Sequence, residues 1–258
     1  MSGHSKWATI KRKKAATDAA RGKIFTKLIK EITIAARMGG GDPAGNPRLR
    51  LAIIAAKSSN MPQDNITRAI KKGTGELEGV HYEEITYEGY GPAGVAIIIE
   101  CVTDNRNRTV SEIRHLMSRN NGNMAESGAV SWNFEHKGVI NITKGNFSED
   151  DILDVILDAG ADDLFNEEEF FQILTSPANL EKVRKALESS STGRLKGLKV
   201  EKASFQYVAK NTMKVSGKDA ENILKLINAL EDHDDVQNVY TNADIDEKII
   251  ADFGQNLQ

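Results

Sequence analysis

A run of basic residues with one aromatic side chain stands near the start of the sequence. Lys11, Arg12, Lys13 and Lys14 are consecutive, and Trp7 precedes them. A helix turns about 100° per residue, so four such cations spread positive charge around most of its circumference. This segment is either a solvated arm or a surface that neutralises the phosphates of a polyanion. Trp7 alone could stack on a base, whereas proteins that bind single strands usually interleave several aromatics with their cations.

The charge of the whole chain favours the second interpretation. Residues 1–75 contain sixteen basic and four acidic residues, a net charge of +12, whereas residues 76–258 carry −15. Such asymmetry indicates a nucleic-acid partner, either DNA or RNA. The expected binding residues are Lys6, Trp7, Lys11, Arg12, Lys13, Lys14, Arg21, Lys23, Lys27, Arg48, Arg50, Arg68, Lys71, Lys72, Arg106 and Arg108.

The last two of these arginines belong to the segment 104–108, which reads Asp-Asn-Arg-Asn-Arg. It follows a predicted strand and precedes a predicted helix. Two guanidinium groups and the free N–H groups of a helix start suit a phosphate. The alternative is a solvated turn in which the aspartate and the asparagines make local hydrogen bonds. The sequence leaves both interpretations open.

Residues 148–171 contain ten acidic residues and no basic ones. Paired carboxylates could hold Mg²⁺ for phosphodiester cleavage, which would make the protein a nuclease. However, Asp150, Asp151, Asp154 and Asp158 fall on the polar face of a predicted helix, as in an ordinary solvated surface. The five histidines are scattered without metal-ligand spacing. We therefore expect no enzyme activity, metal or cofactor, and an acidic surface that could dock a basic protein partner.

The elements that position the basic residues are helices. Apolar spacing predicts a helix over residues 24–38, ended by the glycines at 39–41. Asn46-Pro47 opens a second helix, and a third runs from Met61-Pro62 to Gly73. Residues 1–75 thus form a basic helical domain with an N-terminal arm, and residues 74–81 form a linker.

The pattern then changes to strands. We predict strands at 82–90 and 95–102, a helix opened by a capping box of Thr109 and Glu112, and a strand at 128–134. A strand at 205–209, a helix at 218–230 and a strand at 236–241 continue this pattern. Residues 82–134 and 204–245 are therefore assigned to a middle α/β domain.

Residues 137–203 interrupt that domain. Their predicted order is βαββαβ, which is the order of a ferredoxin-like domain, and they hold the acidic stretch. The predicted fold class is α+β multidomain, with an N-terminal helical domain, a middle α/β domain and an acidic ferredoxin-like domain inserted into it.

Composition bears on the number of domains and on the cellular location of the protein. The chain has 258 residues, of which 40% are hydrophobic, and this suffices for two or three packed domains. A single cysteine, Cys101, excludes an intramolecular disulfide framework. No stretch has the apolar character of a leader or a membrane span. We expect a cytoplasmic protein without a membrane partner, and the oligomeric state stays open.

Five motifs resemble those of the YebC/PmpR family. They are Ser2-Gly-His-Ser-Lys-Trp, Gly40-Gly-Asp-Pro, Asn46-Pro-Arg-Leu-Arg, Thr103-Asp-Asn-Arg-Asn-Arg-Thr and Gly128-Ala-Val-Ser-Trp-Asn-Phe, the last followed by Lys137-Gly138. The resemblance spans essentially the whole chain. It implies a helical domain followed by two α/β domains in a cytoplasmic DNA-binding transcriptional regulator. Relatives, a mitochondrial one among them, act in translation at the ribosome and relieve stalling. A factor that binds ribosomal RNA is therefore the alternative, and the resemblance implies no catalytic residue.

Overall fold

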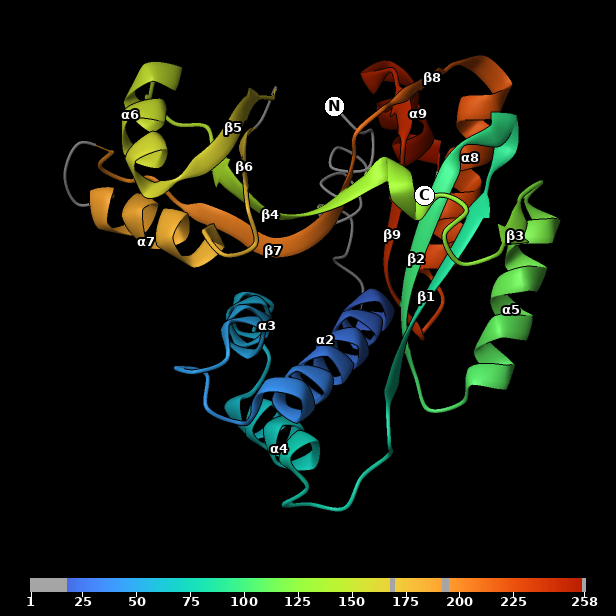
Figure 1. Ribbon diagram of the computed structural model, residues 1–258, viewed down its shortest axis with the longest axis horizontal. Helices are drawn as coiled ribbons and strands as arrows, with labels where there is room; N and C mark the ends of the chain where they lie inside the picture. The colour runs from blue at the N-terminus through green and yellow to red at the C-terminus, as the bar shows by residue number, and fades with distance from the viewer. Residues whose placement is uncertain (1–17, 168–169, 192–194, 257–258) are drawn as a thin grey trace. The chain divides into compact units, whose positions relative to one another are not determined.

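The computed structural model describes residues 18–167, 170–191 and 195–256 (Figure 1). The fold class is α+β, as predicted. The described chain divides into two compact units. One holds the residues up to Glu135 together with those from Ala209 onward, and the other is His136–Val208. The predicted boundaries of three separate domains stay a prediction.

Three helices begin the first unit: α2 (Asp18–Gly39), α3 (Pro47–Ser58) and α4 (Gln63–Thr74). Their shared core includes Ile32, Leu49 and Ile66, each fully buried. Asn46 caps α3, and its amide also donates to the carbonyls of Ala35 and Gly40, which fixes the turn after α2. The predicted helices are confirmed, with α2 longer at its N-terminus.

The predicted end of the third helix at Gly73 is wrong. Gly73 lies inside α4, where a Cβ atom would come within 2.4 Å of the Thr33 carbonyl oxygen of α2. Glycine is needed there because the two helices approach so closely. The helix ends at Thr74, and Gly75 adopts the left-handed conformation that commonly follows a helix.

A four-stranded antiparallel sheet forms the rest of the first unit, in the order β3-β1-β2-β9. The strands are β1 (Glu83–Tyr90), β2 (Ala96–Thr103), β3 (Asn123–Ala125) and β9 (Val236–Thr241). Helices α5 (Arg106–Arg119) and α8 (Gly217–Glu231) share an apolar core with this sheet. Short strands β8 (Met213–Val215) and β10 (Ala243–Ile245) pair in parallel, and α9 (Glu247–Asn256) follows.

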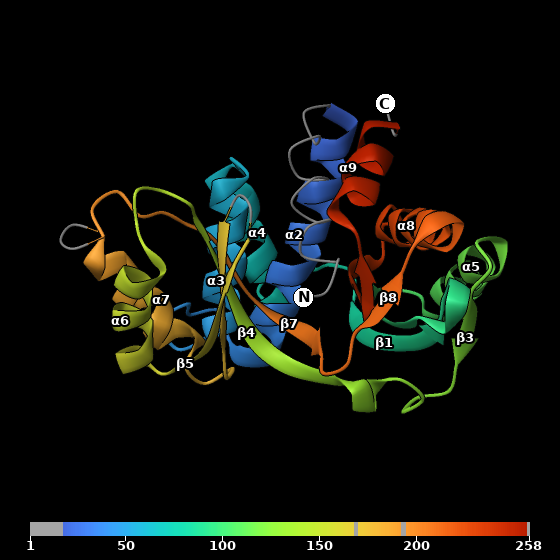
Figure 2. The same cartoon turned by 90° about the horizontal axis from the view of Figure 1, so that it is seen from above.

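The second unit has a sheet in the order β5-β6-β4-β7, with α6 and α7 on one face of it (Figure 2). Along the chain the elements are β4 (Phe134–Thr143), α6 (Glu149–Ala159), β5 (Ala161–Asn166), β6 (Phe170–Thr175), α7 (Leu180–Ser190) and β7 (Val200–Ala209). The order βαββαβ is therefore as predicted. Strands β4 and β7 each continue without a break through a boundary between the units.

Three predictions of local structure are wrong. Helix α5 begins at Arg106 and is capped by Asn105, so Thr109 and Glu112 form no capping box. Residues 128–133 form no strand, because Gly128 has a φ of +92° and residues 131–133 make a 3₁₀ turn; of the predicted strand only Phe134 is in one, as the first residue of β4. The two strands expected at 198–203 and 205–209 are one strand, β7. None of the described helices combines the length and apolar character that a membrane span requires.

Candidate nucleic-acid interface

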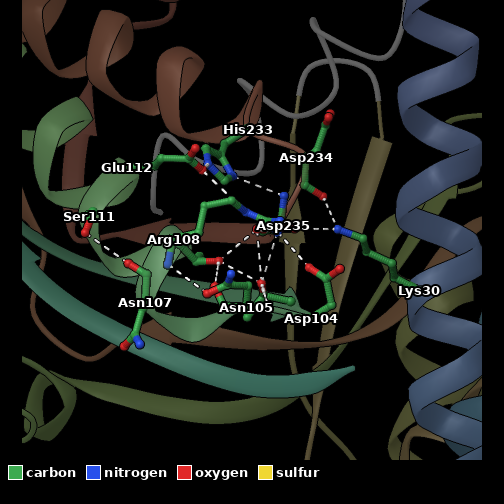
Figure 3. A network of polar contacts seen from close by, with 12 residues as sticks. Lys30, Asp104, Asn105, Asn107, Arg108, Ser111, Glu112, His233, Asp234 and Asp235 are labelled. Carbon is green, nitrogen blue, oxygen red and sulfur yellow. Dashed lines mark hydrogen bonds and ion pairs between the residues drawn. The ribbon is translucent and has the colours of Figure 1, made fainter. Parts of the chain in front are cut away.

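Asp235 is the centre of a buried polar network in the first unit (Figure 3). It directly precedes β9, and only 3% of its surface is exposed. One carboxylate oxygen accepts from Lys30 Nζ at 2.6 Å. The other accepts from Arg108 Nη2 at 2.8 Å and Thr109 Oγ1 at 2.8 Å. The network thus joins α2, the first turn of α5 and the start of β9.

Local sequence explains how α5 presents its side chains to Asp235. Asn105 accepts from the backbone N–H of Arg108, while its own N–H donates to Thr103 Oγ1 at 2.9 Å. These bonds place the first helical turn so that Thr109 faces inward and Thr103 Oγ1 lies 2.7 Å from Thr109 Oγ1. Asn105 therefore makes the local hydrogen bonds that the alternative interpretation of residues 104–108 predicts.

The network stabilises the charged form of Asp235. Burial alone would raise the pKa of Asp235, but hydrogen bonds from Lys30, Arg108 and Thr109 hold that pKa well below its usual range. The carboxylate is therefore ionised at neutral pH and forms ion pairs with Lys30 and Arg108. Removing one partner of a buried ion pair is costly because the other charge is left buried without a partner. This arrangement suits a structural link between α2 and the sheet.

Glu112, His233 and Asp235 bring three potential metal-ligand atoms within 4.8 Å of one another. Their chemistry does not fit a cation. Both oxygens of Asp235 already accept from charged side chains. His233 Nδ1 accepts the Asp235 N–H at 3.1 Å, so its Nε2, 2.8 Å from Glu112, is the nitrogen that donates. All three side chains already have hydrogen-bond partners within the protein.

Lysines on one side of α2 contact the C-terminal end of α8 and the chain segment that follows it. Lys23 Nζ donates to the Asp232 carbonyl at 3.2 Å, Lys27 Nζ to that of Glu231 at 2.6 Å, and Lys30 Nζ to that of Asp234 at 2.9 Å. A helix C-terminus carries partial negative charge and unpaired carbonyls, which ammonium groups satisfy. Lys23 and Lys27, expected as phosphate ligands, thus already serve a contact within the protein.

The arginines of α3 are also engaged. Arg48 donates to Glu31 through Nε at 2.7 Å and Nη2 at 2.9 Å, and it forms an ion pair with Glu84. Burial would lower the pKa of Arg48, but the hydrogen bonds with both glutamates outweigh burial and raise it. Arg50 is half-buried and Arg21 is exposed, and each has an interaction within the chain.

Four of the expected phosphate ligands stand free on the described surface. Arg68, Lys71 and Lys72 are exposed on α4, and Arg106 is exposed at the start of α5. None of these four side chains forms an ion pair with a described residue. Their spacing along α4, three and four residues apart, places the first three on one face. Lys6, Trp7, Lys11, Arg12, Lys13 and Lys14 lie outside the described residues.

Sequence reasoning missed an exposed tryptophan. Trp132 is 66% exposed, and its indole N–H donates to the Ala129 carbonyl at 3.0 Å. Its loop is held by buried Glu88, which accepts three backbone N–H groups of residues 128, 130 and 131. The expectation that Trp7 alone could stack is therefore too narrow. Glu88 lies between Tyr87 and Gly89 in a predicted strand, and that pattern does not point to residue 132.

Comparison with known proteins identifies relatives over nearly the full chain. Residues 5–76 match the family model described as "TACO1/YebC protein N-terminal domain", and residues 82–243 match "TACO1/YebC second and third domain". A "Probable transcriptional regulatory protein" of Desulfotalea psychrophila is 58% identical over 99% of this chain and 100% of its own length. A protein of the same description from Chlorobaculum tepidum is 58% identical over 97% and 98%.

A solved structure is also similar. The crystal structure of a conserved hypothetical protein from Aquifex aeolicus matches with a TM-score of 0.80 and 46% sequence identity. The match covers 89% of this chain and 92% of that one. The fold therefore has an experimental counterpart.

Proposed function

Because the chain belongs to the TACO1/YebC family, we propose that it is a cytoplasmic regulatory protein that binds nucleic acid through its basic N-terminal part. The observation that carries the proposal is the net charge of +12 on residues 1–75, opposed by −15 on the remainder. Positive charge concentrated on one part supplies affinity for phosphates without regard to base sequence. The names of the bacterial relatives support a transcriptional regulator as the first candidate, and we propose that it binds DNA.

The basic residues divide into two groups: some make contacts within the protein, and others are exposed to solvent. Lys23, Lys27 and Arg48 link parts of the first unit to one another. Arg68, Lys71 and Lys72 offer an unpaired face of α4 to solvent. We infer that this face and the N-terminal arm make the phosphate contacts, with Arg106 as a further contact and Trp132 as a stacking surface.

We expect the charge of the α4 face to matter for binding. Replacing Arg68, Lys71 and Lys72 together with glutamine should weaken binding to all duplex sequences alike and flatten the plot of log K against log salt by up to about 2.7. Fluorescence anisotropy over a salt series measures both quantities. The matched control replaces the exposed Lys214, Lys218 and Lys225. Equal effects of the two triple variants would contradict a specific role for α4.

A second candidate is a translation factor that binds ribosomal RNA and relieves stalling. Arg48 and Arg108 are paired with carboxylates of the protein. Few guanidinium groups are then left to read base edges in the major groove, and this favours the second candidate. Lysines on a helix face recognise backbone and shape, which DNA and folded RNA both offer. We therefore expect discrimination between promoter and random DNA well below the roughly thousandfold typical of dedicated repressors.

Competition binding at physiological salt separates the two candidates. Labelled promoter DNA is displaced with unlabelled promoter DNA, random DNA and ribosomes at equal phosphate concentration. Ribosomes that outcompete both duplexes would exclude the transcription hypothesis. A preference for the promoter of a thousandfold or more would exclude the translation hypothesis, and it would also contradict the weak sequence preference expected here.

We propose that binding occurs without catalysis, metal or cofactor. Among the acidic residues of the second unit, Asp162 pairs with Lys137 at 3.0 Å, and Asp151 caps its own helix with Ser148. These carboxylates have structural partners, which argues against the nuclease hypothesis; cleavage of a labelled duplex that EDTA suppresses would revive it. We further infer that residues 137–203 are an inserted ferredoxin-like domain whose acidic surface docks a basic protein partner.

A further inference from the structure

The second unit contains a basic cavity that the proposed nucleic-acid binding does not use. It has a volume of about 380 Å³ and is lined by the β4–α6 loop and the turn before β7. Lys144, Lys196 and Lys199 contribute to its wall, together with Asn146 and Phe147. Small-molecule sites commonly have volumes of about 300–1,000 Å³. The size is therefore sufficient for a small organic ligand.

No acidic side chain among the described residues neutralises the three lysines. None of them forms an ion pair with a described residue, and Lys144 Nζ lies 5.4 Å from the centre of the Phe171 ring. Glu201 contacts the cavity wall by accepting from the Thr143 hydroxyl at 3.3 Å. Three lysines in one wall concentrate positive charge at this cavity. The local charge therefore selects an anionic ligand.

The turn that carries two of these lysines is held in place without a ligand. Leu195 and Leu198, which flank Lys196 and Gly197, are buried. The Gly197 N–H donates to the Ser191 carbonyl at 3.0 Å, and the Leu198 N–H donates to that of Leu195 at 2.9 Å. Gly197 has a φ of +88°, which disfavours other residues there. Because the turn is preformed, an anion need not order it on binding.

The opposite wall is fixed in a similar way. The Thr143 N–H donates to the Lys199 carbonyl at 3.1 Å and so joins the two loops. At Gly145 a Cβ atom would lie 2.6 Å from the Phe147 ring, so glycine allows that ring to pack over the loop. Phe147 supplies an apolar surface next to the ammonium groups. An anion that also carries an apolar or aromatic part fits this combination better than a bare ion.

Charge on the whole unit decides between a small anion and a polymer. Residues 136–208 contain thirteen acidic and nine basic residues, a net charge of −4. The cavity loop leads directly into α6, whose first turn holds Glu149, Asp150 and Asp151. A polynucleotide would have to run past these carboxylates, whereas a small anion interacts with the lysines alone. We propose that this cavity binds a small phosphate ester, such as a nucleoside monophosphate, independently of nucleic-acid binding by the first unit.

Isothermal titration calorimetry on the full chain tests the proposal with AMP and inorganic phosphate as probes. We expect AMP to bind more tightly than phosphate. Replacing Lys196 and Lys199 together with glutamine should weaken AMP binding at least about tenfold, because two charge-assisted contacts are lost. The matched control replaces Lys182 and Lys185, exposed lysines of α7 in the same unit, and should change the affinity less than about twofold.

Amide NMR spectra show which residues AMP contacts. AMP should shift the resonances of Gly145 and Gly197 in the wild-type protein, and this shift should be lost in the double variant while the other resonances of the folded unit persist. Absence of AMP binding at millimolar concentration would overturn the proposal. So would equal losses in the pocket and control variants. An unphosphorylated oligonucleotide that binds this cavity when AMP does not would also overturn it, in favour of a polymer site.

Discussion

Replacing Asp235 with alanine is expected to lower the free energy of unfolding of the first unit by about 3–5 kcal/mol, the range for a buried ion pair broken from one side. Lys30 is 7% exposed and would lose its carboxylate partner. Thr109, fully buried, would lose a hydrogen bond as well. The loss is large because the remaining charge cannot reach water without moving α2 away from the sheet.

Urea unfolding followed by tryptophan fluorescence measures this effect, because Trp132 lies in the same unit. The control is Asp234→Ala, an exposed neighbour of which only the backbone carbonyl contacts Lys30. We expect the control to change the unfolding free energy by about 0.5 kcal/mol or less, as for other surface substitutions. If both variants unfold at the same urea concentration, Asp235 does not hold the unit together.

The same carboxylate sets a pH dependence. The pKa of Asp235 is lower in the folded protein than in the unfolded chain, where aspartate titrates near about 3.9. Its stabilisation is therefore fully present above that pH and is lost as the pH falls through the lower folded pKa. The difference in stability between wild type and Asp235→Ala should be constant from neutral pH down to about 5 and shrink only in stronger acid.

The second large effect is expected from the N-terminal arm. Replacing Lys11, Arg12, Lys13 and Lys14 with alanine should flatten the dependence of log K on log salt by up to about 3–4 on duplex DNA, if each cation neutralises one phosphate. Phosphate contacts release counterions and carry no base information, so affinity should fall alike for promoter and random sequences. Fluorescence anisotropy at several salt concentrations gives the slope directly.

A matched quadruple variant controls for net charge. It replaces Lys214, Lys218, Lys225 and Lys248, which are exposed and lie outside residues 1–75. That variant should leave the slope close to the wild-type value. An arm variant with an unchanged slope would show that the arm does not contact the nucleic acid, and the α4 face would then have to supply the affinity by itself.

Elements set by local signals could be predicted from the sequence. Asn46-Pro47 opens α3 as expected, and the apolar run before Thr103 forms β2. Competing local signals caused the error at α5. Asn105 and Thr109 can both cap a helix, and the choice of Asn105 depends on Asp235, which holds Thr109 inside the unit. No pattern near residue 109 reports a partner 126 positions away.

The same limit applies to the candidate interface. Lys23 and Lys27 lie off the apolar stripe of α2, and that position alone predicts exposure to solvent and phosphate. Their neighbours are carbonyls at the C-terminal end of α8, more than 200 positions along the chain. The α4 cations remain exposed because no element of the described chain covers that face. Charge could be counted from the sequence, but which charges are free could not.

The pairing of β2 with β9 affects the order in which the two units can fold during synthesis. Val236–Thr241 is the partner of Ala96–Thr103, so this sheet cannot be completed until nearly the whole chain has left the ribosome. Residues 136–208 are contiguous and need no later segment. We expect them to fold on the nascent chain before the sheet of the first unit is complete, which protease protection of stalled chains would reveal. Asp235 emerges immediately before β9, so the link to α2 closes as one of the last steps, and chains truncated before it would expose an unfinished apolar sheet.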